Sequence, residues 1–205
     1  GLHALQHRGQ EACGIASVKD SRFYTERHQG LVGDAFGGAD LSQRMPGGAA
    51  VGHTRYSTSG GSFLRNIQPM FADLDQGGIA IAHNGNLTNV EQLAKEIYES
   101  DLRHVNTNSD SEVLLNVFAH ELAQRGKLQP TEEDVFAAVT HVHERCVGGY
   151  AVVAMITGYG IVGFRDPNGI RPIVFGQRHT DEGVEYMIAS ESVSLDVLGF
   201  TLIRD

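Results

Sequence analysis

The segment best suited to chemistry is His83–Asn86, read as HNGN. It follows Ile79–Ala82, an apolar run typical of a buried strand. Asn-Gly is a frequent turn former, because both residues tolerate positive φ. The carboxamide of Asn84 beside the uncovered backbone N–H of Gly85 also forms a pair of donors that suits a developing oxyanion. A hairpin turn and an oxyanion site are the two interpretations, and the Asn-Gly pair alone favours the turn.

The residues after Asn86 argue against a simple hairpin. Val90–Leu102 predicts a helix, because its apolar residues recur at intervals of three and four. We therefore expect Asn84 and Gly85 in a connection between a strand and a helix, where binding sites are common. His83 precedes them, and we expect it to fix this connection by hydrogen bonds.

Two charged residues have the chemistry to hold the two ends of a free amino acid. Arg55 ends the predicted strand Ala49–Tyr56, and its guanidinium suits a carboxylate, with the Thr58 hydroxyl on the same side. Asp110 starts the predicted helix Asp110–Arg125, where a carboxylate is stabilised by the helix dipole and is able to receive an ammonium group. An ordinary surface arginine and an ordinary helix cap are the alternatives.

Neither cysteine has the setting of a nucleophile. Cys13 lies within a predicted strand without a neighbouring base, and free cysteine is among the most buried residue types. Cys146 falls on the apolar side of a predicted helix. Two cysteines are too few for a disulfide framework or a CxxC metal site. His141 and His143 are two positions apart and point away from each other on a helix, so no metal is expected.

The composition predicts a folded domain and excludes two classes of partner. The 205 residues are 41% hydrophobic and 20% charged, as in globular proteins. A net charge of −9 without a basic run argues against nucleic acid. No apolar stretch approaches the ~20 residues of a membrane span, and no signal peptide is visible. We expect a cytoplasmic protein.

Predicted helices occupy the middle of the chain, and predicted strands flank them on both sides. This order indicates an α+β fold, not the alternation of a doubly wound parallel sheet. We find no linker or change in composition, so residues 1–205 are expected to form one domain. The first residue, Gly1, reads as the middle of a helix without an N-cap, so further residues are expected upstream.

Six segments in this order resemble the class II glutamine amidotransferase domain over essentially all 205 residues. They are LQHRGQEACGI (Leu5–Ile15), GHTRYSTSG (Gly52–Gly60), AHNGNLTN (Ala82–Asn89), TNSDSEVLLN (Thr107–Asn116), FRDPNGIRP (Phe164–Pro172) and ASESVSLDVLGF (Ala189–Phe200).

The resemblance implies a four-layer αββα sandwich of the N-terminal-nucleophile hydrolase type. In that family an N-terminal cysteine is the nucleophile and its own α-amine is the general base. The cysteine belongs to a strand ahead of the segment that matches Gly1–His7, so we expect the fold with its first strand missing. Cys13 matches an ordinary strand position. The chain is therefore expected to be inactive by itself.

The resemblance also implies a role for each candidate residue. Arg55 would hold the α-carboxylate of glutamine, with Thr58 nearby, and Asp110 would hold the α-amino group. Asn84 and the Gly85 N–H would form the oxyanion hole. Arg8, in the QHRGQ motif, would lie close to the nucleophile and help to order it.

The QHRGQ, RYST, DSE and RDPNGIRP motifs favour the branch of the family that supplies ammonia to a phosphoribosyltransferase domain. That branch forms phosphoribosylamine from phosphoribosylpyrophosphate in the first step of de novo purine synthesis. We expect this second domain after Asp205, with Mg²⁺ and phosphoribosylpyrophosphate bound there, and no cofactor within residues 1–205. The resemblance implies a homo-oligomer of the full-length protein. The alternatives are an aminosugar- or asparagine-forming amidotransferase and a non-catalytic amino-acid-binding module.

Overall fold

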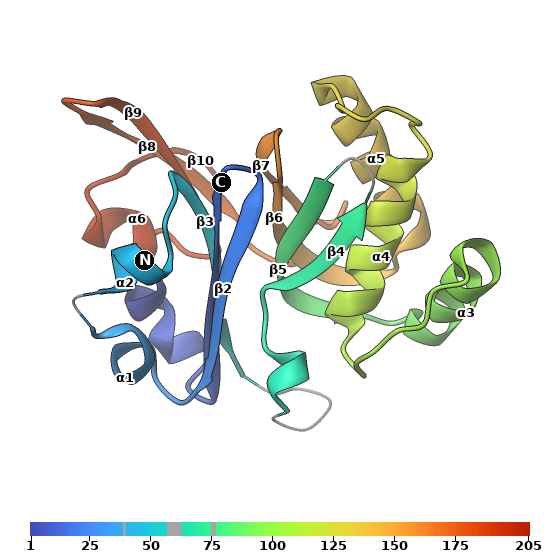
Figure 1. Ribbon diagram of the computed structural model, residues 1–205, viewed down its shortest axis with the longest axis horizontal. Helices are drawn as coiled ribbons and strands as arrows, with labels where there is room; N and C mark the ends of the chain where they lie inside the picture. The colour runs from blue at the N-terminus through green and yellow to red at the C-terminus, as the bar shows by residue number, and fades with distance from the viewer. Residues whose placement is uncertain (39, 57–62, 75–76) are drawn as a thin grey trace.

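Two β-sheets pack face to face, and helices cover the outer face of each (Figure 1). The computed structural model describes residues 1–38, 40–56, 63–74 and 77–205. Every strand pair in these residues is antiparallel. The α+β class and the four layers expected from the sequence are confirmed.

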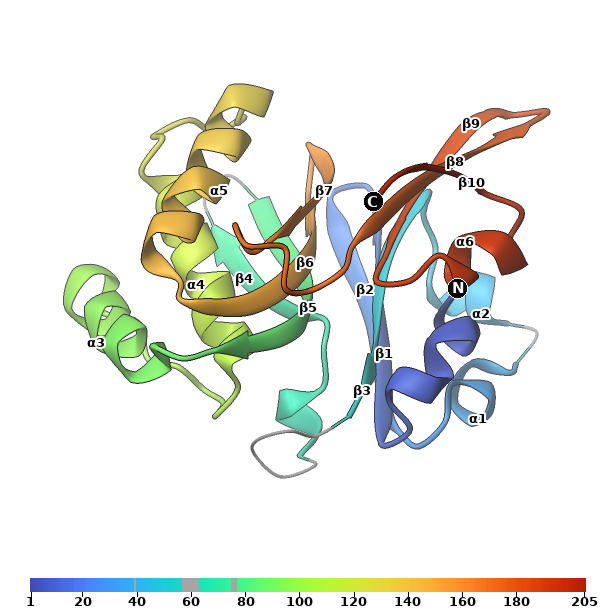
Figure 2. The ribbon, with the colours of Figure 1, turned by 180° about the vertical axis from the view of Figure 1, so that it is seen from behind.

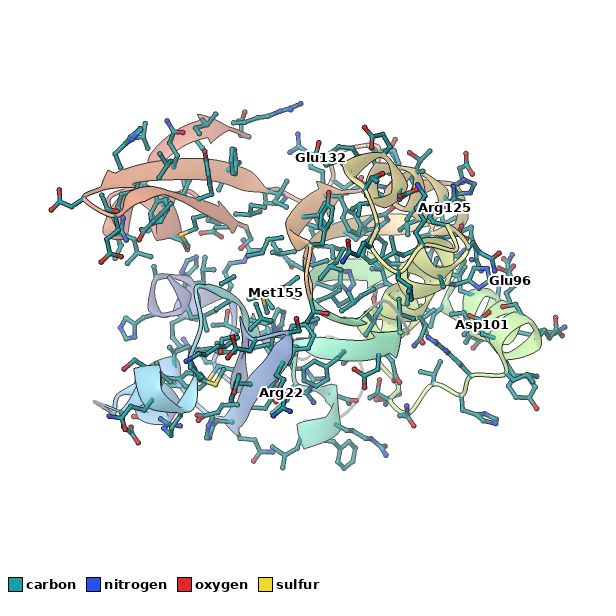
Figure 3. The ribbon with its side chains drawn as sticks, turned by 45° about the horizontal axis from the view of Figure 1, so that its top comes forward. Arg22, Glu96, Asp101, Arg125, Glu132 and Met155 are labelled. Carbon is teal, nitrogen blue, oxygen red and sulfur yellow. The ribbon has the colours of Figure 1, made fainter. Side chains whose placement is uncertain are left out.

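The first sheet has the order β2-β1-β3 and consists of Ala12–Lys19 (β1), Arg22–Gln29 (β2) and Ala49–Arg55 (β3). Side chains alternate across a strand, so β1 serves two cores. Ala16 packs toward the second sheet, together with Met155, which lies near the centre of Figure 3. Cys13 packs on the opposite face against the short helices. These helices are η1 (Leu2–Arg8), α1 (Val32–Phe36) and α2 (Leu41–Arg44).

The second sheet has the order β4-β5-β6-β7, and three longer helices cover it. Its strands are Met70–Leu74 (β4), Gly77–Leu87 (β5), Gly148–Ile156 (β6) and Gly160–Arg165 (β7). The helices are Val90–Asp101 (α3), Asp110–Ala123 (α4) and Glu132–Arg145 (α5). The largest apolar core lies between this sheet and α4, where Leu114 and Phe118 are fully buried.

A third sheet of order β10-β8-β9 lies on the side of the first sheet (Figure 2). It contains Val174–Thr180 (β8), Gly183–Ala189 (β9) and Thr201–Arg204 (β10), with α6 (Val193–Val197) packed near η1. None of the helices in the described part of the chain combines the length and apolar character that a membrane crossing requires.

The sequence prediction was wrong about the end of the strand that carries Asn84. β5 runs through HNGN to Leu87, and Gly85 pairs with Tyr150 on β6. The Asn-Gly pair forms neither a turn nor a connection, because β6 holds it in the ladder. The prediction also missed β4 and α1, whose short segments carry too little periodic signal.

Candidate active site

Six residues singled out in the sequence line a single cavity of about 1130 Å³. Thr58 lies outside the described residues. Segments far apart in the chain meet here, since β3, β5, β9 and the start of α4 all contribute to the walls. The six residues are Arg8, Arg55, His83, Asn84, Gly85 and Asp110.

One edge of β5 presents its backbone N–H groups to the site. Along an antiparallel strand, successive N–H groups point to alternate edges. The His83 N–H donates to Oε1 of Gln68 at 2.6 Å, and the Leu87 N–H donates to Oδ2 of Asp110 at 3.0 Å. The pairing register is continuous through β5. The Gly85 N–H therefore points to the same edge, between these two hydrogen bonds and about 6.8 Å of strand from the Leu87 N–H.

The carboxamide of Asn84 is directed to the other sheet. Side chains alternate along β5, and Asn84 shares the face of Ala80 and Ala82, which pack between the two sheets. Its Nδ2 is buried and donates to no residue within the described part of the chain. A buried donor without a protein acceptor costs free energy unless a ligand or water accepts from it. This nitrogen is therefore suited to an oxygen on a bound molecule.

Glycine is required at position 85 by both conformation and space. Its φ is +148°, a region that residues with a Cβ rarely adopt. A Cβ there would lie 2.1 Å from the carbonyl oxygen of Gly149 and 2.7 Å from Cα of Tyr150. The close approach of β6 fixes the Gly85 N–H in place.

Asp110 is the first residue of α4, and its carboxylate is anchored by β5. Besides accepting from Leu87, it lies 3.9 Å from Nδ1 of His83 through Oδ1. Ser109 is the N-cap, since its Oγ accepts from the Ser111 N–H. The sequence SDSE has the pattern of a capping box, but Ser109 and Glu112 do not form one, because the Glu112 carboxylate accepts from the backbone N–H groups of residues 106 and 107.

Arg55 ends β3 and is only 7% exposed. Burial lowers the pKa of its guanidinium, and the charge of Glu11 opposes that shift. Gly9 of the QHRGQ motif explains part of this placement, since a Cβ at Gly9 would lie 2.4 Å from the carbonyl carbon of Arg55. The motif thus sets the backbone from which Arg55 enters the cavity.

Arg8 binds a carboxylate from a distant part of the chain. Its Nη1 donates to Oε1 of Glu191, and Nε2 of His7 lies 2.9 Å from the other carboxylate oxygen. Burial raises the pKa of Glu191, but the hydrogen bonds from Arg8 and His7 outweigh burial, and the net shift of the pKa is downward. The ASES segment therefore holds Arg8 at the cavity wall.

The RDPNGIRP loop is organised by backbone hydrogen bonds to Asp166. The two arginines that flank this motif suggest an Arg–Asp ion pair, but the structure shows backbone donors at Asp166 instead. The Asp166 carboxylate is 2% exposed and accepts from the N–H groups of Tyr150, Asn168, Ile170 and Arg171. The loop in turn places Arg171 at the cavity wall.

Positive charge surrounds the two histidines beside the site. Burial lowers the pKa of His53 to about 3, and the charges of His83, Arg55 and Arg8 act in the same direction, although a hydrogen bond to the His83 backbone opposes it. Burial also lowers the pKa of His83, and Asp110 opposes that shift while Arg171 adds to it. Burial and the nearby arginines thus disfavour a positive charge on these imidazoles, and the arginines give the cavity a positive potential that suits an anionic intermediate.

Neither thiol of the chain reaches the cavity. Cys13 is fully buried between β1 and the short helices, and Cys146 is 4% exposed in the helix-side core. Burial raises the pKa of Cys13 and raises that of Cys146 to about 12. Within the described residues, no three His, Cys, Asp or Glu side chains gather as a metal site.

Sequence reasoning missed several residues at the site. Gln68 and Ser111 are buried and hydrogen-bonded to His83, and Arg171 lines the cavity. Ser111 adjoins the predicted Asp110, which is a usable signal. Gln68 precedes an unpredicted strand, so its sequence context carries none.

The sandwich and the cavity between its sheets match one class of protein. Residues 53–197 match the family described as glutamine amidotransferase domain, and the chain belongs to that family. Its fold is the αββα sandwich of the N-terminal-nucleophile hydrolases, as expected.

Individual relatives and solved structures are similar to this chain over nearly its whole length. The chain is 71% identical over 204 residues to the amidophosphoribosyltransferase of Pseudomonas aeruginosa, covering 100% of this chain and 40% of that protein. A solved structure titled the allosteric regulatory enzyme of purine biosynthesis superimposes with a TM-score of 0.79 at 36% identity, covering 99% of this chain and 40% of that one. The glutamine phosphoribosylpyrophosphate amidotransferase of B. subtilis gives 0.77 at 33% identity, with the same coverage. The chain thus spans about two fifths of the length of these relatives.

Proposed function

We propose that residues 1–205 form the glutaminase part of an amidophosphoribosyltransferase. In the complete protein this part hydrolyses glutamine and supplies ammonia for phosphoribosylamine formation from phosphoribosylpyrophosphate. The observation that carries the proposal is the convergence of Arg55, Asp110, Asn84 and Gly85 on one cavity. Membership of the family and the similarity to amidophosphoribosyltransferases support it.

The binding step uses the two charged residues. The guanidinium of Arg55 receives the α-carboxylate of glutamine, and the carboxylate of Asp110 receives the α-ammonium group. The side-chain carboxamide then extends along the β5 edge toward Gly85. A single ligand of this size is able to touch Asp110 and the Gly85 N–H, because only two residues of strand separate their anchoring points.

The chemical step uses the donors of β5. A thiolate attacks the carboxamide carbon, and the carbonyl oxygen becomes an anion that accepts from Nδ2 of Asn84 and the N–H of Gly85. The nitrogen takes up the proton released by the thiol, the C–N bond breaks as the intermediate collapses, and ammonia leaves. Water then hydrolyses the glutamyl thioester, which gives glutamate and the free thiol. Removing one such donor typically costs about 10²–10³ in rate.

The thiolate comes from outside residues 1–205 in this proposal, since neither Cys13 nor Cys146 lines the cavity. The cavity has a wall that suits such a segment. β3 and β9 stand at the ends of their sheets in the strand order and both line the cavity, so an extended cysteine-led segment is able to pair there.

Ammonia consumption is assigned to the remainder of the complete protein, because the relatives are about two and a half times as long as this chain. The 71% identity to an amidophosphoribosyltransferase favours the phosphoribosyl branch over aminosugar- or asparagine-forming enzymes. Binding of Mg²⁺ with phosphoribosylpyrophosphate and self-association remain predictions for the complete protein.

Glutamate release from glutamine tests the proposal with two forms of the protein. We expect no release above background from residues 1–205, and turnover once a cysteine-led strand precedes Gly1. Equal turnover in the two forms would refute the external nucleophile. A cysteine-led form that binds glutamine without hydrolysing it would favour the amino-acid-binding module instead.

A further inference from the structure

The side chain of Gln68 makes the two hydrogen bonds to His83 of β5 that the backbone of a neighbouring strand would otherwise make. β4 pairs with β5 through Met70 opposite Ile81, so the same register extended by two residues sets Gln68 opposite His83. Pro69 intervenes and has no N–H to donate. The Gln68 side chain supplies the missing ladder instead, since its Oε1 accepts from the His83 N–H at 2.6 Å and its Nε2 donates to the His83 carbonyl at 3.1 Å.

The same amide also reaches the start of α4. Nε2 of Gln68 lies 3.0 Å from Oγ of Ser111, and that hydroxyl lies 2.9 Å from Nδ1 of His83. The three residues form a closed and buried set of contacts, in which the Gln68 amide contacts the His83 backbone and Ser111 joins the two side chains. Gln68, Ser111 and His83 are 7%, 2% and 3% exposed. Polar groups buried in this way hold their geometry, because breaking one contact leaves a desolvated partner.

Two neighbours of this set belong to the proposed glutamine site. Asp110 precedes Ser111, and its Oδ1 lies 3.9 Å from Nδ1 of His83. Asn84 follows His83 on β5. The set therefore joins the element that carries the ammonium-binding carboxylate to the element that carries the oxyanion donors.

We propose that Gln68, with His83 and Ser111, is a positioning residue that fixes the Asp110 carboxylate relative to the β5 donors. The proposal rests on the glutamine-binding role assigned above to Asp110. Its chemical consequence is selectivity: Gln68 sets the affinity for the α-ammonium group of the substrate and leaves the carboxylate contact at Arg55 untouched.

The test compares glutamine with 4-carbamoylbutanoate, the same molecule without its α-amino group. The complete protein is assayed by glutamate release, which gives KM for glutamine and, by competition, Ki for the analogue. Gln68→Met keeps the side-chain length and removes both amide groups. We expect KM to rise about tenfold, as for loss of a hydrogen bond to a charged group, and Ki to change less than about twofold. The matched control is Gln92→Met, the same change on the exposed face of α3.

A second pair of variants decides the case where Gln68→Met fails to fold. His83→Asn keeps a polar atom near the position of Nδ1 for Ser111, whereas His83→Phe keeps the ring and removes the contact. We expect KM near the wild-type value for the first and about tenfold higher for the second.

The outcomes separate this proposal from the proposed function. A parallel rise in KM and Ki, or no change in either, would overturn the positioning role of Gln68. Equal KM in the two His83 variants would overturn the positioning role of the set, since the His83–Ser111 contact closes it. A wild-type protein that does not hydrolyse glutamine, or that binds the analogue as tightly, would instead refute the function assigned to Asp110.

Discussion

Replacing Gly85 with alanine tests how closely β6 holds the oxyanion segment. The new Cβ would lie 2.1 Å from the Gly149 carbonyl oxygen and 2.7 Å from Cα of Tyr150, distances that require the two strands to separate. The substitution also places an L-residue at a φ of +148°. Backbone strain of this kind costs about 1–3 kcal/mol, and forced overpacking about 1–3 kcal/mol more.

The matched control is Gly158→Ala in the turn between β6 and β7. Gly158 has a φ of +77°, and a Cβ there would meet no atom within 4 Å, so this variant carries the backbone strain without the clash. We expect Gly85→Ala to be less stable than the control by about 2 kcal/mol, the middle of the overpacking range. For a domain of this size that difference is about 4–8 °C in Tm.

Thermal unfolding and glutamate release together measure the effect. In a cysteine-led form of the protein, the displaced Gly85 N–H should also lower kcat about 10²–10³-fold, while Gly158→Ala keeps wild-type kcat. If Gly85→Ala and Gly158→Ala have the same Tm, the contact between Gly85 and β6 is not tight. If Gly85→Ala keeps wild-type kcat, the Gly85 N–H does not face the reacting oxygen.

Three further predictions follow from the contacts of individual residues. In the active form, Asn84→Ala should lower kcat about 10²–10³-fold with little change in KM, whereas Arg55→Ala should chiefly raise KM; the reverse pattern in steady-state kinetics would contradict the assigned roles. Asp166→Asn should destabilise the fold by about 2–4 kcal/mol, because the carboxylate accepts four backbone N–H groups. Burial raises the pKa of Asp166, but the hydrogen bonds outweigh burial, and the net shift of its pKa is downward. The contribution of Asp166 to stability is therefore present above pH ~4 and lost as the pH falls through the folded-state pKa. Urea titrations between pH 6 and 3 should show a flatter dependence of stability on pH for the variant, and parallel dependences would disprove this linkage. Native protein at pH 8 should resist alkylation at Cys13 and Cys146, since burial raises the pKa of both thiols, and rapid labelling detected by mass spectrometry before unfolding would show that one is accessible.

Strongly periodic segments of the chain could be predicted from the sequence. The predicted helix Asp110–Arg125 and the predicted strand around Cys13 match α4 and β1, because burial on one face imposes that periodicity. The pattern of helices and strands alone indicates only the α+β class. The four-layer sandwich was predicted from six sequence motifs that occur in the same order as in the family. The charges of Arg55 and Asp110 were also recognisable, because each residue type suits one end of an amino acid.

The geometry of the candidate site could not be predicted from the sequence. The glycine of HNGN reads as a turn signal in isolation, and only the approach of Gly149 and Tyr150 shows why it lies in a strand. Gln68 and His83 are distant in sequence and meet through an extension of the β4–β5 register, which no local pattern encodes.

A crystal structure of residues 1–205 with L-glutamine bound tests the central claim most directly, because without a thiol at the cavity the ligand stays intact. The account predicts the α-carboxylate on the Arg55 guanidinium, the α-ammonium group on the Asp110 carboxylate, and the side-chain carbonyl oxygen within hydrogen-bond distance of Asn84 Nδ2 and the Gly85 N–H. Glutamine that contacts only one of these groups, or that binds outside this cavity, would contradict it.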